Sequence, residues 1–442
     1  MAPSNDAVQA ATTPTTLDFQ LQNQTTSGTV YAYITGQAID KDNALFLLKS
    51  DGKTAYYPAS PSGSNQALGA DCAIPLGAVG NSVTVTIPRL AGARLWFVRD
   101  DKLTFYLNSG PSLVEPSPSN TADANYNKYW DFCEFTFNDQ QLYANISYVD
   151  FVSLPISLTL TTSSGQTKHV AGIPADGLDT ICSGLTSQQA KDKAGWDKLI
   201  VKKGDANLRA VSPNTGITLN SGLFDNYYSS YVDQVWSKYA SDSLTINTQN
   251  SSGNVAAKIS NGELNFANGA ATYGKPAAAD IFSCSSGPFA VAGKTEKDAI
   301  TARLAAAFNR SNLLTNTNTP DGDKVTDYYQ NAVTNHYSRI VHAANLDSRG
   351  YAFPYDDVAP SDGNDQSGSV FDGSPKSLTV VVGGGTASKN GNQSKNTTGS
   401  KGPSNDAKTP TTTQPSQGAK KSINWKDILN FLNILKRLPC FK

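Results

Sequence analysis

Short runs in which apolar and polar residues alternate occupy the first part of the chain. They lie at residues 31–34, 44–48, 83–87, 94–98, 131–137 and 146–160, and clusters of Gly, Pro, Asn and Asp separate them. Alternation with a period of two, bounded by turn-forming residues, is typical of antiparallel strands. Pro155 in the last run indicates a bulge or an edge strand. We therefore predict a β-sandwich or β-barrel domain over residues 15–171, preceded by a disordered start at residues 1–14.

Helical periodicity replaces this pattern from about residue 172. Helices are predicted at residues 177–185, 187–199, 231–239 and 295–314. In the last of them Ile300, Leu304 and Phe308 recur every four positions, which places them on one face. One further strand is predicted at residues 377–382. The pattern thus predicts a β-rich α+β protein in which a mixed α/β domain, residues 172–347, is inserted into the β domain, and residues 348–383 complete that domain.

The end of the chain has a different composition. Residues 384–420 are rich in Gly, Ser, Thr, Asn and Lys and hold too few apolar residues to order themselves, so they are a predicted disordered linker. Residues 421–442 form a predicted amphipathic helix whose apolar stripe is Trp425, Ile428, Leu432, Leu435 and Leu438. This basic helix is expected either to bind a surface or partner, or to dock on its own body.

Charge and composition narrow the class of partner. The 36 Lys and Arg residues nearly balance the 37 Asp and Glu residues, so nothing favours nucleic acid or a charged membrane surface, and a neutral polymer fits better. No run is long enough to span a bilayer. No secretory signal is visible in the chain as given, yet the composition is typical of extracellular β-rich proteins. We expect a monomeric, extracellular or cell-wall-associated protein.

Cysteine and histidine usage excludes an obvious metal centre. The five cysteines contain no CxxC pair, and the chain has three histidines, so we expect no metal and no cofactor. An odd number of cysteines leaves at least one thiol unpaired, and Cys440 is the first candidate.

Two carboxylates differ from their surroundings in a way that suggests chemistry. Glu134 shares strand parity with Thr136 and Asn138, while aromatic residues occupy the opposite face. Asp150 lies between Val149 and Phe151 in an otherwise apolar run, where an unpaired charge is costly. Hydrolysis of a glycosidic bond requires one carboxylic acid and one carboxylate on either side of the bond.

The spacing of these two residues leaves the stereochemical outcome open. If their strands form a hairpin about residues 139–145 with an even register, Glu134 and Asp150 lie on one face, with Cβ atoms roughly 4.5–8 Å apart. Inverting glycosidases need carboxyl groups about 6.5–9.5 Å apart and retaining ones roughly 5–5.5 Å. The alternative interpretation makes Glu134 a surface residue and Asp150 a buried hydrogen-bond anchor.

Several longer motifs carry a resemblance to a known family. The chain resembles the laminaripentaose-producing β-1,3-glucanases of glycoside hydrolase family 64, which have a thaumatin-like fold. The matching blocks span about residues 125–385 and include DFCEFT, YVDFVSLPI, GLDTICSGL, FDNYYSSYVDQVWSKY, DIFSCSSGPFA, ARLAAAFNRSNLL, NHYSRIVHAANLDSRGYAFPYDDVAP and DQSGSV. The resemblance implies a thaumatin-like β domain and an inserted mixed α/β domain that flank a wide cleft for a β-1,3-glucan chain.

The resemblance also implies roles for individual residues. Glu134 is the implied general acid and Asp150 the implied general base of an inverting hydrolysis. The implied sugar-contacting residues are Thr136, Asn138, Tyr143, Ser147, Asp356 and Asp357. Tyr143 and Ser147 stand where the family has Trp and Thr, which changes the expected subsite preference. Ala305 replaces a family cysteine, which leaves Cys284 without its implied partner.

Two classes of function follow from these observations. The first is an endo-acting glycoside hydrolase that cleaves β-1,3-glucan, such as laminarin, curdlan or cell-wall glucan, with inversion and releases short laminarioligosaccharides. The second is a non-catalytic thaumatin-like module for β-glucan binding or defence, since one scaffold hosts unrelated functions. Product length, the origin of the glucan and the role of the C-terminal helix stay open at this point.

Overall fold

The computed structural model describes residues 13–361, 363 and 365–385. The predicted C-terminal helix, with Trp425 and Cys440, lies outside these residues, as do nearly all of the predicted linker and residues 1–12. Thr13, which falls in the predicted disordered start, is buried, and its backbone N–H donates to the Asp139 carbonyl at 3.1 Å. Contacts with the body of the protein therefore begin ahead of the first strand.

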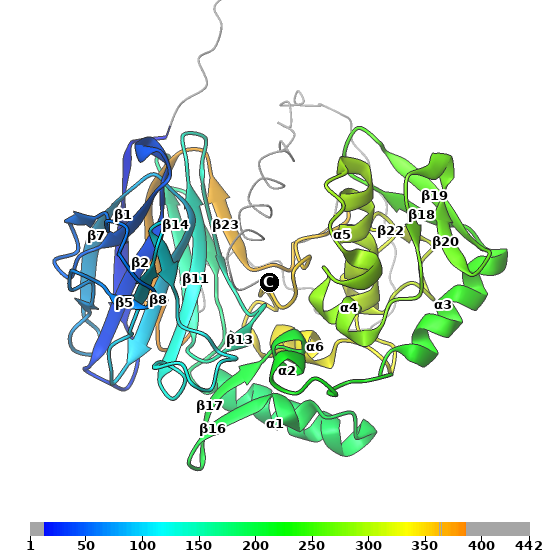
Figure 1. Ribbon diagram of the computed structural model, residues 1–442, viewed down its shortest axis with the longest axis horizontal. Helices are drawn as coiled ribbons and strands as arrows, with labels where there is room; N and C mark the ends of the chain where they lie inside the picture. The colour runs from blue at the N-terminus through cyan, green and yellow to red at the C-terminus, as the bar shows by residue number, and fades with distance from the viewer. Residues whose placement is uncertain (1–12, 362, 364, 386–442) are drawn as a thin grey trace, which may run out of the picture. The chain divides into compact units, whose positions relative to one another are not determined.

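One sheet joins the beginning of the described chain to its end. It is five-stranded, in the order β15-β14-β24-β1-β7. Its strands are β1 (Thr16–Asn23), β7 (Ser82–Pro88), β14 (Ile156–Thr162), β15 (Thr167–Val170) and β24 (Pro375–Val382). β24 runs parallel to β1 and antiparallel to β14, so a strand from the end of the described chain lies between two strands from its first part (Figure 1).

A second sheet carries most of the residues of interest. It is eight-stranded, in the order β23-β12-β11-β8-β2-β3-β4, with β6 paired to β2. Its strands are β2 (Val30–Ala38), β3 (Ala44–Leu48), β4 (Ala55–Tyr56), β6 (Ile74–Pro75), β8 (Leu90–Arg99), β11 (Tyr129–Phe137), β12 (Leu142–Ile146) and β23 (Ser369–Asp372). A small three-stranded sheet, β10-β9-β5, consists of β5 (Gln66–Ala67), β9 (Tyr106–Asn108) and β10 (Ser112–Val114).

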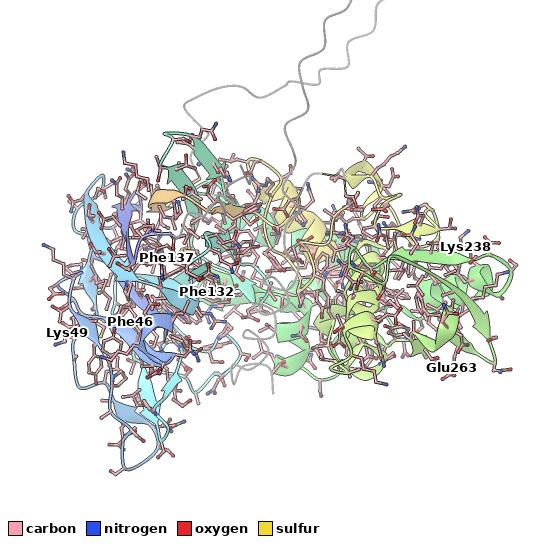
Figure 2. All side chains as sticks on the ribbon, turned by 90° about the horizontal axis from the view of Figure 1, so that it is seen from above. Phe46, Lys49, Phe132, Phe137, Lys238 and Glu263 are labelled. Carbon is pink, nitrogen blue, oxygen red and sulfur yellow. The ribbon has the colours of Figure 1, made fainter. Side chains whose placement is uncertain are left out.

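The two large sheets share a core of alternate residues. Along β1 every second residue is buried and those between are mostly exposed, as the period of two predicts. Phe19 of β1 packs edge to face on Phe135 of β11, with ring centroids 5.0 Å apart, and both side chains are fully buried. Phe46, Phe132 and Phe137, which Figure 2 labels, all lie on strands of the eight-stranded sheet. The β-rich fold predicted from the alternation is confirmed.

Helices occupy the middle of the chain, where the helical periodicity begins. They are α1 (Gly177–Asp192), α2 (Pro213–Leu219), α3 (Ser229–Ser241), α4 (Ala278–Ser283), α5 (Thr295–Arg310) and α6 (His336–Ala344), with short 3-10 turns at Ile39–Lys41, Trp196–Leu199, Ala267–Gly269, Gly287–Phe289 and Val325–Asp327. In α5 the predicted stripe of Ile300, Leu304 and Phe308 is fully buried. From Ala299 onwards the other α5 residues are buried as well, so α5 is a central helix with packing on every face.

Two small sheets accompany these helices. β13 (Phe151–Val152), β17 (Ala206–Val211) and β16 (Ile200–Lys203) form one of them. The other has the order β21-β20-β19-β18-β22 and consists of β18 (Leu244–Asn247), β19 (Asn254–Ser260), β20 (Glu263–Phe266), β21 (Thr272–Tyr273) and β22 (Asn318–Thr319). Helix α5 lies beside β18 and β22 (Figure 1).

The two helices predicted at residues 177–185 and 187–199 are a single helix followed by a 3-10 turn. Helix α1 runs through the predicted break at residue 186 without interruption, and the Thr186 hydroxyl there donates to the Cys182 carbonyl one turn back. The helix ends at Lys193, which has a left-handed φ of 60°, and Gly195, at φ 105°, turns the chain into the 3-10 segment. The predicted boundary was wrong because the stop signal lies about eight residues further on.

The strand predicted at residues 146–160 is also divided. β12 ends at Ile146, β13 spans Phe151–Val152 in a different sheet, and β14 begins at Ile156 in the five-stranded sheet. Pro155 lies between β13 and β14, where its missing N–H is tolerated. The chain therefore changes sheet twice in this segment, and Asp150 lies in a bend instead of on a strand paired with β11.

Candidate active site

A row of polar side chains crosses the eight-stranded sheet. Thr35 of β2 pairs with Arg94 of β8, Arg94 with Glu134 of β11, Glu134 with Asn145 of β12, and Asn145 with Ser369 of β23. Residues directly opposite each other on neighbouring strands point to the same face. All five side chains are therefore on the face of the sheet opposite Phe135, and the burial of the row gives Glu134 a partly dry environment.

Arg94 holds two carboxylates at once. Its Nη1 donates to Oε2 of Glu115 at 2.6 Å, and its Nη2 and Nε approach Oε1 of Glu134 at 3.3 and 3.4 Å. The guanidinium also lies over the ring of Phe132, 4.6 Å from its centroid. Because Arg94 is only 5% exposed, these charges interact through protein more than through water.

Asp150 lies beside the same face of the sheet as Glu134, but in a bend and not, as the sequence suggested, on a strand paired with β11. The next residue, Phe151, packs on Trp130 and Phe132 of β11, with ring centroids 4.7 and 5.9 Å away. Both β11 rings point to the Glu134 side of the strand, because alternate residues share a face. The half-buried Asp150 is thus anchored beside this face through its neighbour.

The charges that act on the Asp150 carboxyl are those of the same groups. Burial raises the pKa of the Asp150 carboxyl, the Arg94 guanidinium lowers it, and the carboxylates of Glu134 and Glu115 raise it again. Burial also raises the pKa of Glu115, which Arg94 opposes and Glu134 reinforces. Three carboxylates and one guanidinium therefore act on one another in this part of the structure, and burial favours the protonated forms of Asp150 and Glu115.

Thr136 and Tyr143 form the next pair along the β11–β12 hairpin. The Thr136 hydroxyl oxygen is buried and has no hydrogen-bond partner among the described residues. The Tyr143 ring stacks on Phe371 of β23, with centroids 6.2 Å apart and planes 18° from parallel. Phe371 is 39% exposed, so this pair presents an aromatic surface two residues along from Glu134.

Asn138 and Ser147 serve the backbone in this structure. Oδ1 of Asn138 accepts the N–H groups of Gln140 and Gln141, both at 2.9 Å, which closes the hairpin turn between β11 and β12. Ser147 follows β12, is 5% exposed and forms an isolated parallel bridge with Tyr351.

Asp356 and Asp357 are adjacent in sequence but have different environments. Asp356 is fully buried: Oδ1 pairs with Arg310 Nη2 at 3.2 Å, and Oδ2 accepts His342 Nε2 at 2.9 Å and the Ala352 N–H at 3.0 Å. Its carboxylate is thus fully engaged inside the protein, which is a different environment from the sugar-contacting one that the motif implies.

Asp357 is half-buried and keeps unused capacity. Its Oδ1 is buried without a partner among the described residues, and the nearby Tyr351 hydroxyl donates to the Pro354 carbonyl at 3.3 Å. Burial, with repulsion from Asp365, raises the pKa of Asp357 to about 6. Burial raises the pKa of the Tyr143 phenol, and the negative charge of Asp357 raises it further. Asp357 therefore lies near the Tyr143 end of the polar face.

The sequence reasoning missed two members of the cluster. Arg94 had a usable signal, because it is a charged residue in an apolar run, the same criterion that selected Asp150. Glu115 had none, since it follows the short strand β10 and meets Arg94 only because the small sheet packs there.

Four of the five cysteines lie in the part of the chain that the structure describes. Cys72, Cys133, Cys182 and Cys284 are buried, whereas Cys440 lies outside the described residues. In the described part of the chain no group of three or more His, Cys, Asp and Glu side chains is arranged to hold a metal ion. No helix within residues 13–385 has the length and apolar character needed to cross a membrane.

Comparison with known proteins matches the chain to one family. Residues 15–382 match the model of glycoside hydrolase family 64, described as β-1,3-glucanase. A glucan endo-1,3-β-glucosidase of Arthrobacter sp. (strain YCWD3) is 27% identical over 398 residues, which cover 87% of this chain and 70% of that protein. One of Cellulosimicrobium cellulans is 26% identical over 383 residues, covering 85% of this chain and 66% of that protein.

Solved structures show the same fold. A laminaripentaose-producing β-1,3-glucanase in complex with laminaritetraose superposes with a TM-score of 0.74 at 28% identity, covering 83% of this chain and 98% of that one. A family 64 β-1,3-glucanase domain from Clostridium beijerinckii gives a TM-score of 0.66 at 20% identity with the same coverage. At that identity the second likeness concerns the fold alone.

Proposed function

The chain belongs to glycoside hydrolase family 64, the β-1,3-glucanase family, and from this we propose that it is an endo-acting hydrolase of β-1,3-glucan that releases short laminarioligosaccharides. The observation that carries the proposal is the buried ion pair of Glu134 with Arg94, whose charges also act on the carboxyl of Asp150 in the bend beside the sheet. Both similar curated relatives are named glucan endo-1,3-β-glucosidases. The substrates in view are laminarin, curdlan and cell-wall glucan.

We propose that Glu134 is the general acid. It is 8% exposed, and its carboxyl stands at the centre of the polar row. The proton that it donates passes to the glycosidic oxygen as the bond to the anomeric carbon breaks, so that the leaving sugar departs as a neutral alcohol. Arg94 holds the carboxyl in place through the contacts to Oε1.

Asp150 is the proposed general base. Its carboxylate takes a proton from a water molecule as that water attacks the anomeric carbon from the face opposite the leaving oxygen, which inverts the configuration. A raised pKa brings a carboxylate base closer to neutrality and strengthens it as a proton acceptor. Because Asp150 is only half-buried, water can reach it.

Sugar binding is proposed to involve the face beside the acid. Thr136 offers a buried hydroxyl with unmet hydrogen-bonding capacity, and Tyr143 stacked on Phe371 offers an aromatic surface suited to a pyranose ring. Asp357 supplies a carboxylate oxygen that has no hydrogen-bond partner in the described ranges 13–361, 363 and 365–385. Asn138 and Ser147 are proposed only as neighbours that shape this surface, and Asp356 is left out of the proposed set because its carboxylate is fully engaged.

The finer fold features are part of the same proposal. We propose that a thaumatin-like β domain, residues 15–171 with 348–383, and a mixed α/β domain, residues 172–347, flank a wide cleft for the glucan chain. The likeness to a laminaritetraose-bound β-1,3-glucanase supports this arrangement. A crystal of Glu134→Gln soaked with laminaritetraose tests it, and sugar bound away from Thr136 and Tyr143 would contradict it.

The cellular setting is proposed on composition alone. We expect a monomer that acts outside the cell or at the cell wall, with the C-terminal basic segment available to a surface or partner. Fractionation of the producing culture, with detection of the chain in the supernatant and wall fractions, tests this expectation. Recovery only from the cytosol would contradict it.

The catalytic assignment is tested by the products from laminarin. Glu134→Gln and Asp150→Asn are each expected to lower kcat by at least about 10³-fold, since each removes a proton-transfer group, while glucan binding persists. Proton NMR of the fresh product is expected to show the α-anomer first. Wild-type protein that retains insoluble β-1,3-glucan but releases no soluble sugar would favour the binding-module alternative, and an initial β-anomer would exclude inversion.

A further inference from the structure

Arg94 is shared unequally between two carboxylates. The contact to Glu115 is 2.6 Å, whereas both contacts to Glu134 are 3.3 Å or longer. The three residues come from three separate elements: β8, β11 and the segment after β10. Glu115 therefore directly follows the small β10-β9-β5 sheet, and it meets the polar row through this ion pair and through Thr35.

Glu115 is held in place by a hydrogen-bond chain. The indole N–H of Trp96 donates to the Thr35 hydroxyl oxygen at 3.0 Å. A hydroxyl has one hydrogen, so the Thr35 group that accepts from Trp96 can donate its own hydrogen to the Glu115 carboxylate, with which it is hydrogen bonded. Glu115 is thus built into the sheet and its side chain is 14% exposed.

Arg94 is equally restrained. Its guanidinium lies 4.6 Å from the centroid of Phe132 and 5.4 Å from that of Trp96, and its side chain is 6% exposed. An arginine stays charged at every pH at which an enzyme works. A fixed positive charge beside the general acid favours the carboxylate form of that acid, which is the form that cannot donate a proton.

We propose that Glu115 is a positioning residue of the acid–base machinery: its short ion pair with Arg94 engages the guanidinium, so that Glu134 keeps the weaker contacts and can carry the proton for the leaving oxygen. The inference rests on the proposed function, because it concerns how Glu134 and Asp150 divide their tasks. Arg94 orients the acid, and Glu115 offsets the charge that Arg94 brings with it.

The groups that face Glu134 decide the expected sign. They are Arg94 from β8, Glu115 from the segment after β10 and Asp150 from the bend before β13, whereas the thiol of Cys133 on β11 itself points to the opposite face. Neutralising Glu115 removes a negative charge from this set and leaves the Arg94 charge to the other two carboxylates. Both changes favour the ionised forms of Glu134 and Asp150.

The test is the pH dependence of kcat/KM on laminarin for Glu115→Gln, a nearly isosteric change. Its alkaline limb is expected to move to lower pH by about one unit, so that activity on the alkaline side falls about tenfold, with KM little changed. Arg94→Gln is expected to move the same limb to higher pH. The double variant, Glu115→Gln with Arg94→Gln, loses one negative and one positive charge. The alkaline limb of its pH profile is therefore expected near that of the wild type.

Two controls separate charge from shape. Glu115→Asp keeps the charge and is expected to keep the wild-type limb even if kcat falls. Glu263→Gln, on β20 and exposed, removes a carboxylate far from Phe132, as Figure 2 shows, and is expected to leave the profile unchanged. Circular dichroism and thermal melts establish that each variant is folded.

The outcomes distinguish this inference from the proposed function. If the wild-type protein does not hydrolyse laminarin, that measurement alone refutes both the proposed function and the inference. An active wild type together with Glu115→Gln that loses activity equally at every pH, with unmoved limbs, overturns the inference and leaves the function standing. If Glu115→Gln does not fold, an unmoved limb in Arg94→Gln overturns it as well.

Discussion

Oδ2 of Asp131 accepts the backbone N–H of Ser153 at 2.7 Å, and so ties β11 to the segment that follows Asp150. The same oxygen accepts the Leu154 N–H at 3.0 Å, while Oδ1 accepts the Phe132 N–H at 2.8 Å. β12 pairs with β11 only from Cys133 onwards, so Asp131 has no β12 neighbour and its carboxylate is available to the passing chain. This contact fixes where the chain leaves the Glu134 face.

Asp131→Asn is expected to destabilise the protein by about 2–4 kcal/mol, because an amide nitrogen then faces the two buried N–H donors. Activity on laminarin is expected to fall as well, since Asp150 is three residues from Ser153. Urea unfolding and reducing-sugar release measure the two effects. Asp139→Asn, an exposed residue of the hairpin turn, is the matched control, and equal stability of the two variants would contradict the prediction.

His336 is expected to make the protein sensitive to acid. Arg339 Nε donates to His336 Nδ1 at 2.9 Å, and His336 Nε2 lies 3.1 Å from the Ala332 carbonyl, so the ring is neutral with its hydrogen on Nε2. Burial lowers the pKa of His336 to about 4. The unfolded chain then binds the extra proton first, so this contribution to stability is present above about pH 6.5 and is lost as the pH falls towards 4.

His336→Gln keeps an acceptor for Arg339 and a donor for Ala332 without a group that titrates in this range. Relative to the wild type, it is expected to gain roughly 3 kcal/mol of stability between pH 6.5 and pH 4, from 1.36 kcal/mol per pKa unit. Chemical unfolding at several pH values measures the difference. His169→Gln, on β15, is the control, and a difference between His336→Gln and wild type that is independent of pH would refute the prediction.

Asp357 has the opposite effect to His336 on how stability depends on pH. Because burial raises its pKa from 3.8 to about 6, the folded protein binds this proton more tightly than the unfolded chain. Its contribution is therefore fully present below about pH 4 and is lost as the pH rises through 6. The windows of His336 and Asp357 overlap, so the wild-type curve combines them and only the difference between variant and wild type isolates either one.

Asp357→Asn is expected to have a higher free energy of unfolding than the wild type at pH 7. Between pH 4 and pH 7 the stability of the variant relative to the wild type is expected to rise by up to roughly 3 kcal/mol. If Asp357 contacts sugar, the same variant raises KM for laminarin. Thermal melts at the two pH values and initial rates measure both effects. Asp321→Asn is the control for loss of a carboxylate at a partly exposed site, and a variant less stable than wild type at pH 7 would contradict the sign.

Thr136→Val separates binding from stability. The Thr136 hydroxyl is buried and has no partner within the described part of the chain, so its removal is expected to leave stability unchanged or raise it by about 1 kcal/mol. If that hydroxyl binds the glucan, kcat/KM is expected to fall about tenfold. Thr84→Val, exposed on β7, is expected to change neither quantity. An active, destabilised Thr136→Val variant would show that the hydroxyl serves the fold.

Local patterns in the sequence determined the β-rich first part, the buried stripe of α5 and the faces of β11. Strand parity follows from backbone geometry alone, so Glu134 and Thr136 could be assigned to the face opposite Phe135 before any partner strand was known. The motif blocks also predicted the family, which the match over residues 15–382 confirms.

Only the tertiary structure decided which charges meet. Asp150 is placed beside the Glu134 face by the packing of Phe151 and by the hydrogen bond that the Ser153 N–H donates to Asp131. A hairpin that pairs the Asp150 segment with β11, which the sequence spacing allowed, is not what brings it there. Arg94 and Glu134 are 40 residues apart, and Arg94 and Glu115 are 21 apart, on elements with no shared periodicity. Contacts between separate elements depend on packing of the whole fold, so no local pattern could have shown that one guanidinium pairs with two carboxylates.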